Sequence, residues 1–240
     1  MGFVLGSTAG LAVVRFAARE KIALREDALI TKGFACRHGT PVRGRSQTIE
    51  YFLPGDYLEA TEDRADAPYS VRALSPVLVI SLAPGYERAE LRALYQRRAL
   101  AIGRQWLINI GTRNATQRCA HLLCELFVRL QSAGLAQEQS CQIPLTQADL
   151  ADSLALTPVH VNRTLKKLRE TGLISWRSGV LRIHDFAMLK MLGDFDEHYL
   201  THSPTYEAWT AEHLRGTARA RIPERAPSLA GDPPLHRDHA

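Results

Sequence analysis

The sequence predicts an α+β protein with a β-rich N-terminal domain, a long central helix and a smaller helical domain that ends in a β-hairpin. Three observations predict this class. Short apolar runs between Gly, Pro and charged residues fill residues 1–85, a helical pattern without proline covers residues 86–112, and two closely spaced helix starts lie within residues 113–200. With 240 residues, of which 45% are hydrophobic, the chain can bury a core in more than one domain.

Residues 1–85 are expected to form a small β-sandwich or barrel. Four short runs have strand-like composition and are bounded by turn residues: 22–24, 33–37, 48–53 and 77–80. Pro54 and Gly55 form a turn after the third run, and the polar residues 56–68 are expected to form a loop. The opening MGFVLGSTAGLAVVRF has no basic start and a broken apolar run. It therefore predicts neither a signal peptide nor a membrane span, and we expect a cytoplasmic protein.

The central helix, residues 86–112, carries apolar residues on a seven-residue repeat. Leu94, Ala101 and Ile108 form the repeat, and Leu91, Tyr95 and Ile102 lie beside it. Such a seam can pair with its twin in a coiled coil, so we expect a homodimer interface. The alternative is a helix that packs on its own β domain. A second helix is expected over residues 115–132, with an apolar stripe that supports the elements after it, and residues 132–140 are expected to form a loop.

The segment TQADLADSLALTPVHVNRTLKKLRETGLI predicts two helices joined by a tight break. Thr146 can cap the first helix, with Asp149 as its capping-box partner. Thr157 can cap the second helix, which begins with Pro158 in the first helical turn, and Gly172 is expected to end it. Ala155 stands in the break, where a left-handed backbone costs a residue other than glycine about 1 kcal/mol.

The second of these helices has one apolar and one polar face. Val161, Leu165 and Leu168 share the face expected to pack inward. The opposite half presents an outer set of residues, namely Val159, Asn162, Arg163 and Lys166, with Lys167 and His160 near its edge. A cationic, amide-bearing helix packed across a short partner is typical of helix-turn-helix DNA recognition. The alternatives are a merely solvated face or a surface that binds protein.

A hairpin is expected directly after this helix, with strands near residues 173–176 and 180–183. The region from Pro158 to Arg182 is locally basic, because Glu170 is its one acidic residue against six basic ones: Arg163, Lys166, Lys167, Arg169, Arg177 and Arg182. Such an excess suits contact with DNA phosphates. A last helix is expected to begin after Asp185 and to end at about Leu192. The tail, residues 201–240, is expected to be disordered.

No catalytic or metal chemistry is expected. The four cysteines (Cys36, Cys119, Cys124 and Cys141) form no CxxC pair, which favours a reducing compartment. Cys119, His121 and Cys124 lie close together on one expected helix, but a metal or cluster site needs more ligands, so core thiols are the preferred interpretation. There is no phosphate loop and no pairing of a nucleophile with a base. We therefore expect no enzymatic activity, no metal and no cofactor.

These motifs resemble the Crp/Fnr family of bacterial transcription regulators, over about residues 20–200. The helix-turn-helix segment quoted above carries most of the resemblance, and FACRH and TIEYFLPGD resemble the sensor domain. The resemblance implies a cyclic-nucleotide-binding-like β-roll at 1–85, jelly-roll-like but shortened by the loss of an early hairpin. It also implies a dimerisation helix at 86–112 and a winged helix-turn-helix domain at 113–200. The implied partners are a palindromic DNA operator, a second copy of the chain and RNA polymerase.

The resemblance also implies roles for ten residues. Thr146, Gln147, Thr157 and Lys166 would contact phosphates, and Arg163 would bind a guanine. Pro158 and Val159 replace the polar base-reading pair of the cyclic AMP receptor protein and offer only apolar contact, for example to a thymine methyl group. The remaining three residues would add base readout or wing contacts: His160, Asn162 and Arg177.

The signal is not expected to be cyclic AMP. The family's cassette has an Arg-Ser or Arg-Thr pair before a Val-Arg-Ala, whereas this chain has Ala67 and Pro68 before residues 71–73. Without that arginine a cyclic phosphate loses its bidentate contact, for which Arg64 and Arg72 are the alternatives. Only Cys36 lies in the sensor region, so an iron–sulfur cluster is not expected either. A regulator without a small-molecule signal remains the alternative.

Overall fold

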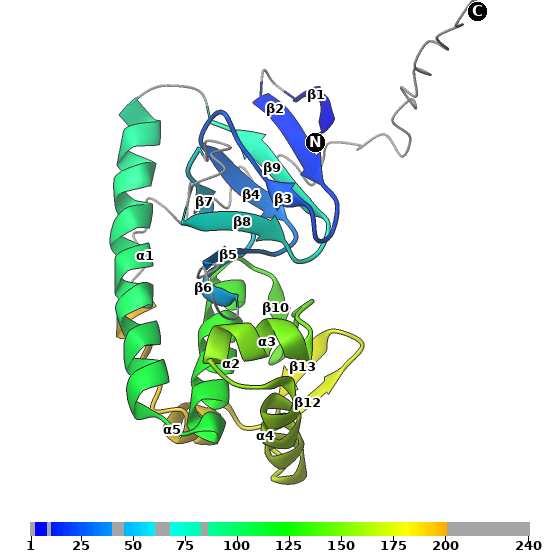
Figure 1. Cartoon of the computed structure of the whole chain (residues 1–240), viewed down its shortest axis with the longest axis vertical. Coiled ribbons are helices and arrows are strands. Elements are labelled where there is room, and N and C mark those ends of the chain that lie inside the picture. The colour runs from blue at the N-terminus through cyan, green and yellow to red at the C-terminus, as the bar shows by residue number, and fades with distance from the viewer. Residues whose placement is uncertain (1–2, 9–10, 40–45, 61–67, 83–85, 201–240) are drawn as a thin grey trace, which may run out of the picture.

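The computed structural model describes residues 3–8, 11–39, 46–60, 68–82 and 86–200 (Figure 1). The expected disordered tail, residues 201–240, lies outside these ranges, as do Arg64 and Ala67 of the cassette. The β domain occupies one end of the molecule and the helix-turn-helix the other, and one long helix runs beside both (Figure 1).

The β domain consists of two antiparallel sheets. The first has the order β1-β2-β9-β4-β7 and the second the order β3-β8-β5-β6. The strand bounds of the first sheet, in that order, are Phe3–Thr8, Leu11–Phe16, Val77–Ser81, Ala28–Lys32 and Tyr57–Leu58. Those of the second are Lys21–Ile22, Tyr69–Ala73, Ala35–Gly39 and Gln47–Phe52. The sheets enclose an apolar core that includes Phe16, Ile30, Phe52 and Ile80.

The four strand-like runs of the sequence correspond to β3, β5, β6 and β9. Two expectations for this domain are wrong. An early hairpin is present, because β1 pairs with β2 and β2 continues the sheet by pairing with β9. Residues 57 and 58, expected in a loop, form β7 on the edge of β4. Asp56 explains this segment: its carboxylate is buried and accepts a hydrogen bond from the Leu53 backbone, so the turn is anchored inside the protein.

The long helix α1, Tyr86–Thr112, has two different apolar faces. Leu91, Tyr95 and Ile102 are buried against the chain's own β domain and helices. For these three residues the alternative interpretation, packing within the chain, is therefore correct. The opposite side carries the most exposed apolar residues of the helix, Leu100 at 56% and Leu107 at 74%.

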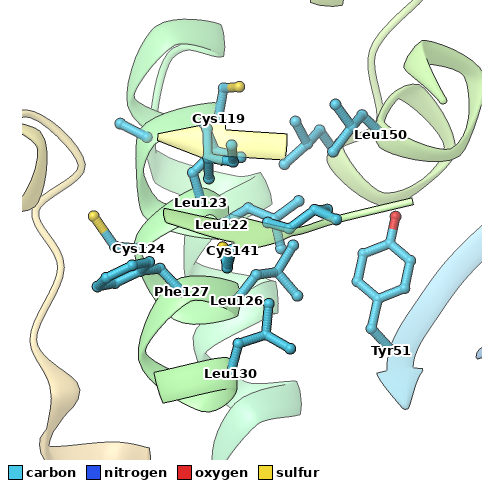
Figure 2. Packing of buried hydrophobic residues seen from close by; sticks show 14 of the residues in the cluster. Tyr51, Cys119, Leu122, Leu123, Cys124, Leu126, Phe127, Leu130, Cys141 and Leu150 are labelled. Atoms are coloured by element: carbon cyan, nitrogen blue, oxygen red, sulfur yellow. The ribbon is translucent and has the colours of Figure 1, made fainter. Parts of the chain in front are cut away.

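The chain reverses direction after α1, and α2, Ala115–Ser132, runs back toward the β domain (Figure 1). Asn114 caps α2 in a capping box with Gln117. The expected stripe of α2 is buried, and Leu122, Leu123 and Leu126 form the centre of the core behind the helix-turn-helix (Figure 2).

The C-terminal domain adds three helices and a four-stranded sheet of order β10-β11-β13-β12. The helices are α3, Gln147–Leu154, α4, Pro158–Glu170, and α5, Phe186–Leu192, which Asp185 caps as expected. A 3-10 helix, η1, follows at Glu197–Leu200. The strands in sheet order are Ala136–Gln137, Ser140–Gln142, Val180–Ile183 and Ile174–Arg177. The loop expected at residues 132–140 is thus partly wrong, because β10 and β11 form a hairpin there whose turn has left-handed Glu138 and Gln139.

A second hydrophobic cluster crosses the boundary between the two domains. Phe34, Tyr51, Leu53 and Leu74 of the β domain belong to the same buried cluster as the residues of α2 and α3. Figure 2 shows Tyr51 reaching from its strand toward Leu150 of α3.

A buried ion network crosses the same boundary. The Arg129 guanidinium of α2 donates to Asp56 at 2.6 Å and to the Tyr51 carbonyl at 2.8 Å, and it also pairs with Glu125 at 3.3 Å. Burial works against the charge of Arg129, but Asp56 and Glu125 outweigh it and raise the pKa of the guanidinium. The β domain and the helices are therefore joined by both apolar packing and buried charge.

Candidate nucleic-acid interface

The first helix of the pair, α3, begins as the sequence predicts. The Thr146 hydroxyl accepts from the Asp149 backbone N–H at 3.2 Å, and Asp149 Oδ2 accepts from the Thr146 backbone N–H at 2.9 Å. This reciprocal capping box satisfies two of the free N–H groups of the helix start. Leu150, Ala151 and Leu154 are buried, so α3 turns its apolar side to α2 and α4.

The break between the helices is a left-handed turn at Ala155, with φ 53° and ψ 42°. The Leu156 backbone N–H then bonds to the Ala151 carbonyl at 3.1 Å. A glycine would adopt this conformation at less cost, and Ala155 is exposed, so its methyl group points into solvent without a clash. The second helix starts three residues after Ala155, at Pro158.

The second helix, α4, has the predicted start, faces and end. The Thr157 hydroxyl accepts from the His160 backbone N–H at 3.2 Å, and Pro158 occupies the first turn. Val161, Leu165 and Leu168 are buried in the shared core. Gly172 follows the helix with φ 72°, a conformation that favours glycine.

The outward face of α4 is open to solvent. Val159 is 64% exposed, although it is apolar, and Arg163 makes no hydrogen bond or ion pair within the described ranges. Lys166 lies 3.6 Å from Glu170, a weak exposed pair. Asn162 donates from Nδ2 to Gln147 Oε1 at 3.2 Å, which joins the outward face of α4 to the start of α3. No pattern in the sequence indicates this amide pair.

The wing forms as predicted. β12 and β13 pair antiparallel, and the two residues between them, Ser178 and Gly179, both have positive φ, at 50° and 78°. Two left-handed residues are what a tight two-residue hairpin requires. Arg177 and Arg182 are exposed on the wing strands.

All ten residues to which the sequence assigned DNA contact are exposed: Thr146, Gln147, Thr157, Pro158, Val159, His160, Asn162, Arg163, Lys166 and Arg177. They come from the start of α3, the outward side of α4 and the wing, which adjoin one another (Figure 1). This surface holds exposed cations, amides and apolar side chains, which suit binding to another molecule.

Sequence reasoning missed Arg19, which contacts this region from the β domain. Arg19, from the turn between β2 and β3, donates to both carboxylate oxygens of Asp149, at 2.7 and 3.1 Å. The two residues are 130 positions apart, and no local pattern relates them.

The sensor region holds only part of the cassette within the described residues. Residues 71–73 lie on or beside β8, and Arg72 is half-buried with its Nε atom unbonded. Cys36, Cys119, Cys124 and Cys141 are free and buried, and burial raises the pKa of Cys119 and of Cys141 to about 12. In the described part of the chain no three His, Cys, Asp or Glu side chains gather as metal ligands. No helix there is long and apolar enough to cross a membrane.

Comparisons with known proteins identify the helical domain. Residues 117–192 match the Crp-like helix-turn-helix domain. The nitrogen fixation regulation protein FixK of Bradyrhizobium diazoefficiens is 28% identical over 158 residues, which cover 62% of this chain and 66% of FixK. The transcriptional activator protein FnrL of Cereibacter sphaeroides is 26% identical over 160 residues, with 62% of this chain and 64% of FnrL covered. The matched region thus spans just under two thirds of each relative.

Solved structures share the fold over most of the chain. FixK2 from Bradyrhizobium japonicum has a TM-score of 0.60 at 19% identity, with 76% of this chain and 96% of that one covered. A transcriptional regulator of the CRP family from Thermus thermophilus has a TM-score of 0.57 at 24% identity, with 75% and 96% covered. The chain thus carries a Crp-like helix-turn-helix domain at residues 117–192, is similar to FixK and FnrL over about two thirds of its length, and shares its fold with solved structures over about three quarters of its length.

Proposed function

We propose that this chain regulates transcription by binding a two-fold symmetric DNA operator as a homodimer. The observation that carries the proposal is the open outward face of α4, on which Arg163 is exposed and unpaired within the described residues. An arginine held on a helix of this kind can donate two parallel hydrogen bonds to guanine in the major groove.

The other residues of this face have different roles in DNA binding. Thr146, Gln147, Thr157 and Lys166 contact phosphates, which fixes the register of α4 in the groove. Val159, exposed despite its apolar side chain, offers a contact to a thymine methyl group. Pro158, His160 and Asn162 line the same face, and Arg177 contacts the backbone from the wing.

Dimerisation occurs through the outward side of α1. Leu100 and Leu107 are exposed there one heptad apart, and a Cβ built on Gly103 or Gly111 would meet no atom within 4 Å. A second copy of α1 can approach such a surface closely, and burying it removes apolar area from water. A symmetric dimer then presents two copies of α4 to two half-sites, one helical turn of DNA apart.

The signal differs from cyclic AMP. Pro68 and Ala67 replace the phosphate-binding pair of the cyclic AMP branch, and Arg72 is half-buried rather than free to take over. The protein works in the cytoplasm, contacts RNA polymerase at the promoter, has no catalytic activity and uses no cofactor.

Genome-fragment selection with the purified chain tests the proposal. The wild type should enrich a two-fold symmetric motif, and Arg163→Ala should lose about 1–3 kcal/mol of discrimination, or roughly five- to 150-fold, at one position of each half-site. Arg169→Ala is the matched control, because it removes one exposed cation from the same helix and should weaken binding to all sequences alike. Binding without sequence preference in the wild type, or a salt-independent affinity, would contradict the proposal and favour a surface that binds protein.

A further inference from the structure

Arg19 of the β domain has a backbone conformation that L-residues other than Asn and Asp rarely adopt. Its φ is 71°, in the left-handed region that favours glycine. The conformation is fixed by β8, because the Arg19 backbone N–H bonds to the Ala73 carbonyl at 2.8 Å, and the Ala73 N–H bonds back to the Glu20 carbonyl at 2.9 Å. A strained position held by an arginine instead of a glycine indicates that the side chain has a task there.

That side chain reaches the start of the helix-turn-helix. Its two terminal nitrogens donate to the two oxygens of Asp149, a planar fork that lysine cannot reproduce. Asp149 is 4% exposed and already caps α3 through Thr146, so its carboxylate serves both the helix and the β domain. Burial disfavours its charge, but the hydrogen bonds from Arg19 and Thr146 outweigh burial and keep the pKa of Asp149 below its ordinary value.

Two further hydrogen bonds hold α3 against the β domain. The buried Tyr51 hydroxyl donates to the Asp149 carbonyl at 2.9 Å, and Gln47 Nε2 donates to the Ser153 carbonyl at 3.3 Å. α3 is thus held near its start and in its last turn by strand β6, and α4 follows it through one left-handed residue, Ala155.

We infer that Arg19 is a positioning residue for DNA recognition, which holds α3 and with it α4 in the orientation that reads the operator. The inference rests on the proposed function and adds to it a residue of the sensor domain. This contact leaves the reading face free, since Thr146, Gln147, His160, Asn162 and Arg163 are all exposed while Arg19 binds Asp149. Arg19 also neutralises a carboxylate beside the helix start that faces phosphate, so its loss adds a repulsion to the loss of alignment.

The link also explains how the sensor domain can influence DNA binding. β8 carries residues 71–73 of the cassette and pairs with β3 and β5, while its Ala73 holds the Arg19 backbone. A shift of this strand moves Arg19, and Arg19 moves the N-terminus of α3. Coupling of this kind is established by a double-mutant cycle, not by contact alone.

The test measures operator affinity of the full chain, normalised to the active fraction by titration, for Arg19→Gly, Arg19→Lys and Asp149→Asn. Arg19→Gly fits the left-handed backbone and removes only the side chain. We expect a roughly tenfold loss of operator affinity for Arg19→Gly, a smaller loss for Arg19→Lys, and little further effect of Arg19→Gly when Asp149→Asn is already present. Arg25→Ala, which removes an exposed cation of the same domain, should leave the affinity within about twofold of the wild type.

A second measurement keeps the inference testable if the wild type selects no operator and the proposed function fails. Hydrogen exchange of the α3 backbone amides should then still be faster in Arg19→Gly than in the wild type or in Arg25→Ala. A purely structural role would lower stability but leave the affinity of the folded fraction and the ratio of operator to non-operator binding unchanged. Affinity and α3 exchange in Arg19→Gly equal to those of Arg25→Ala would overturn the inference.

Discussion

His121 is a buried imidazole in the middle of α2. Its ring is 1% exposed, with Nδ1 at 3.1 Å from the Gly193 carbonyl and Nε2 at 3.2 Å from the Tyr199 hydroxyl. A carbonyl only accepts, so in the neutral ring Nδ1 carries the proton and Nε2 is bare. Burial, with the nearby charge of Arg113, lowers the pKa of His121. The neutral ring therefore donates to the carbonyl that ends α5 and lies beside the Tyr199 hydroxyl of η1, which itself donates to Glu125.

The free energy of unfolding should fall as the pH drops from 7.5 to 5.5. The folded pKa of His121 lies below the unfolded value of about 6.5, so the unfolded chain binds more protons in this interval. Stability from the neutral ring is present above the unfolded pKa and is lost as the pH falls through and below it. In urea titrations, the free energy of unfolding of His121→Gln should differ less between pH 7.5 and pH 5.5 than that of the wild type. His160→Gln, a change at an exposed site, should keep the wild-type difference, and an equal slope in both variants would contradict the assignment.

The sequence could predict the residues that act on near neighbours. Three residues cap helices by bonding to the backbone three positions away, namely Thr146, Thr157 and Asp185, and Asp149 completes the capping box of the first. These signals are local, and all of them are confirmed. Arg19 could not be found in this way, because its partner is determined by how two sheets and a helix pack, which no local pattern encodes.

At the scale of elements, α1 separates two functions on two sides of one helix. The side with Leu91, Tyr95, Ile102 and Trp106 supports the chain's own core, and the Trp106 indole donates to buried Glu125. The side with Leu100 and Leu107 is exposed and serves the proposed dimer. The heptad pattern of the sequence contained Leu91, Tyr95 and Ile102 of the first side but neither Leu100 nor Leu107 of the second. Apolar spacing shows that a face can be buried but not what buries it.

Leu107→Glu should dissociate the dimer without unfolding the protomer. In a symmetric interface the change places two carboxylates in an apolar contact, which should raise the dissociation constant by roughly two orders of magnitude. Sedimentation velocity over a concentration series measures the shift, and circular dichroism verifies the fold. Leu135→Glu changes an exposed leucine away from α1 and should leave the dimer intact. An unchanged oligomeric state in Leu107→Glu would exclude this side of α1 as the interface.

At the scale of the whole molecule, the described domains pack against one another through buried residues. The core continues from the second sheet through α2 to the helix-turn-helix, and Arg129 lies at the crossing with both of its carboxylate partners buried. The order of domains could be predicted from the sequence, because each element has its own periodicity. The packing of the domains against one another could not be predicted, because Tyr51 and Leu53 belong to an ordinary strand pattern. Such a pattern does not indicate which helix the strand contacts.

We expect heat to unfold the described domains in a single transition, and Arg129→Met to lower its midpoint strongly. Removing the guanidinium leaves Glu125 buried without its cation and leaves Asp56 paired with Arg98 alone, which costs about 3–5 kcal/mol, or roughly 10 °C or more for a chain of this size. Calorimetry measures the number of transitions and the midpoint of each. Arg92→Met removes an exposed ion pair with Glu59 and should shift the midpoint by no more than a few degrees. Two separate transitions in the wild type would show that the domains unfold independently.

The buried cluster and the ion network that cross the domain boundary limit how this protein can be recombined with others. A hybrid cut near Arg113, which joins this N-terminal half to a foreign helix-turn-helix, would keep Phe34, Tyr51 and Leu53 on a surface without its matching helices. New sensor and operator pairings should therefore require the facing residues of β5 and β6 to change together with those of α2 and α3. Among the residues whose burial is described, none of the five-stranded sheet belongs to the cluster that joins the domains, so we expect that sheet to need no matching change.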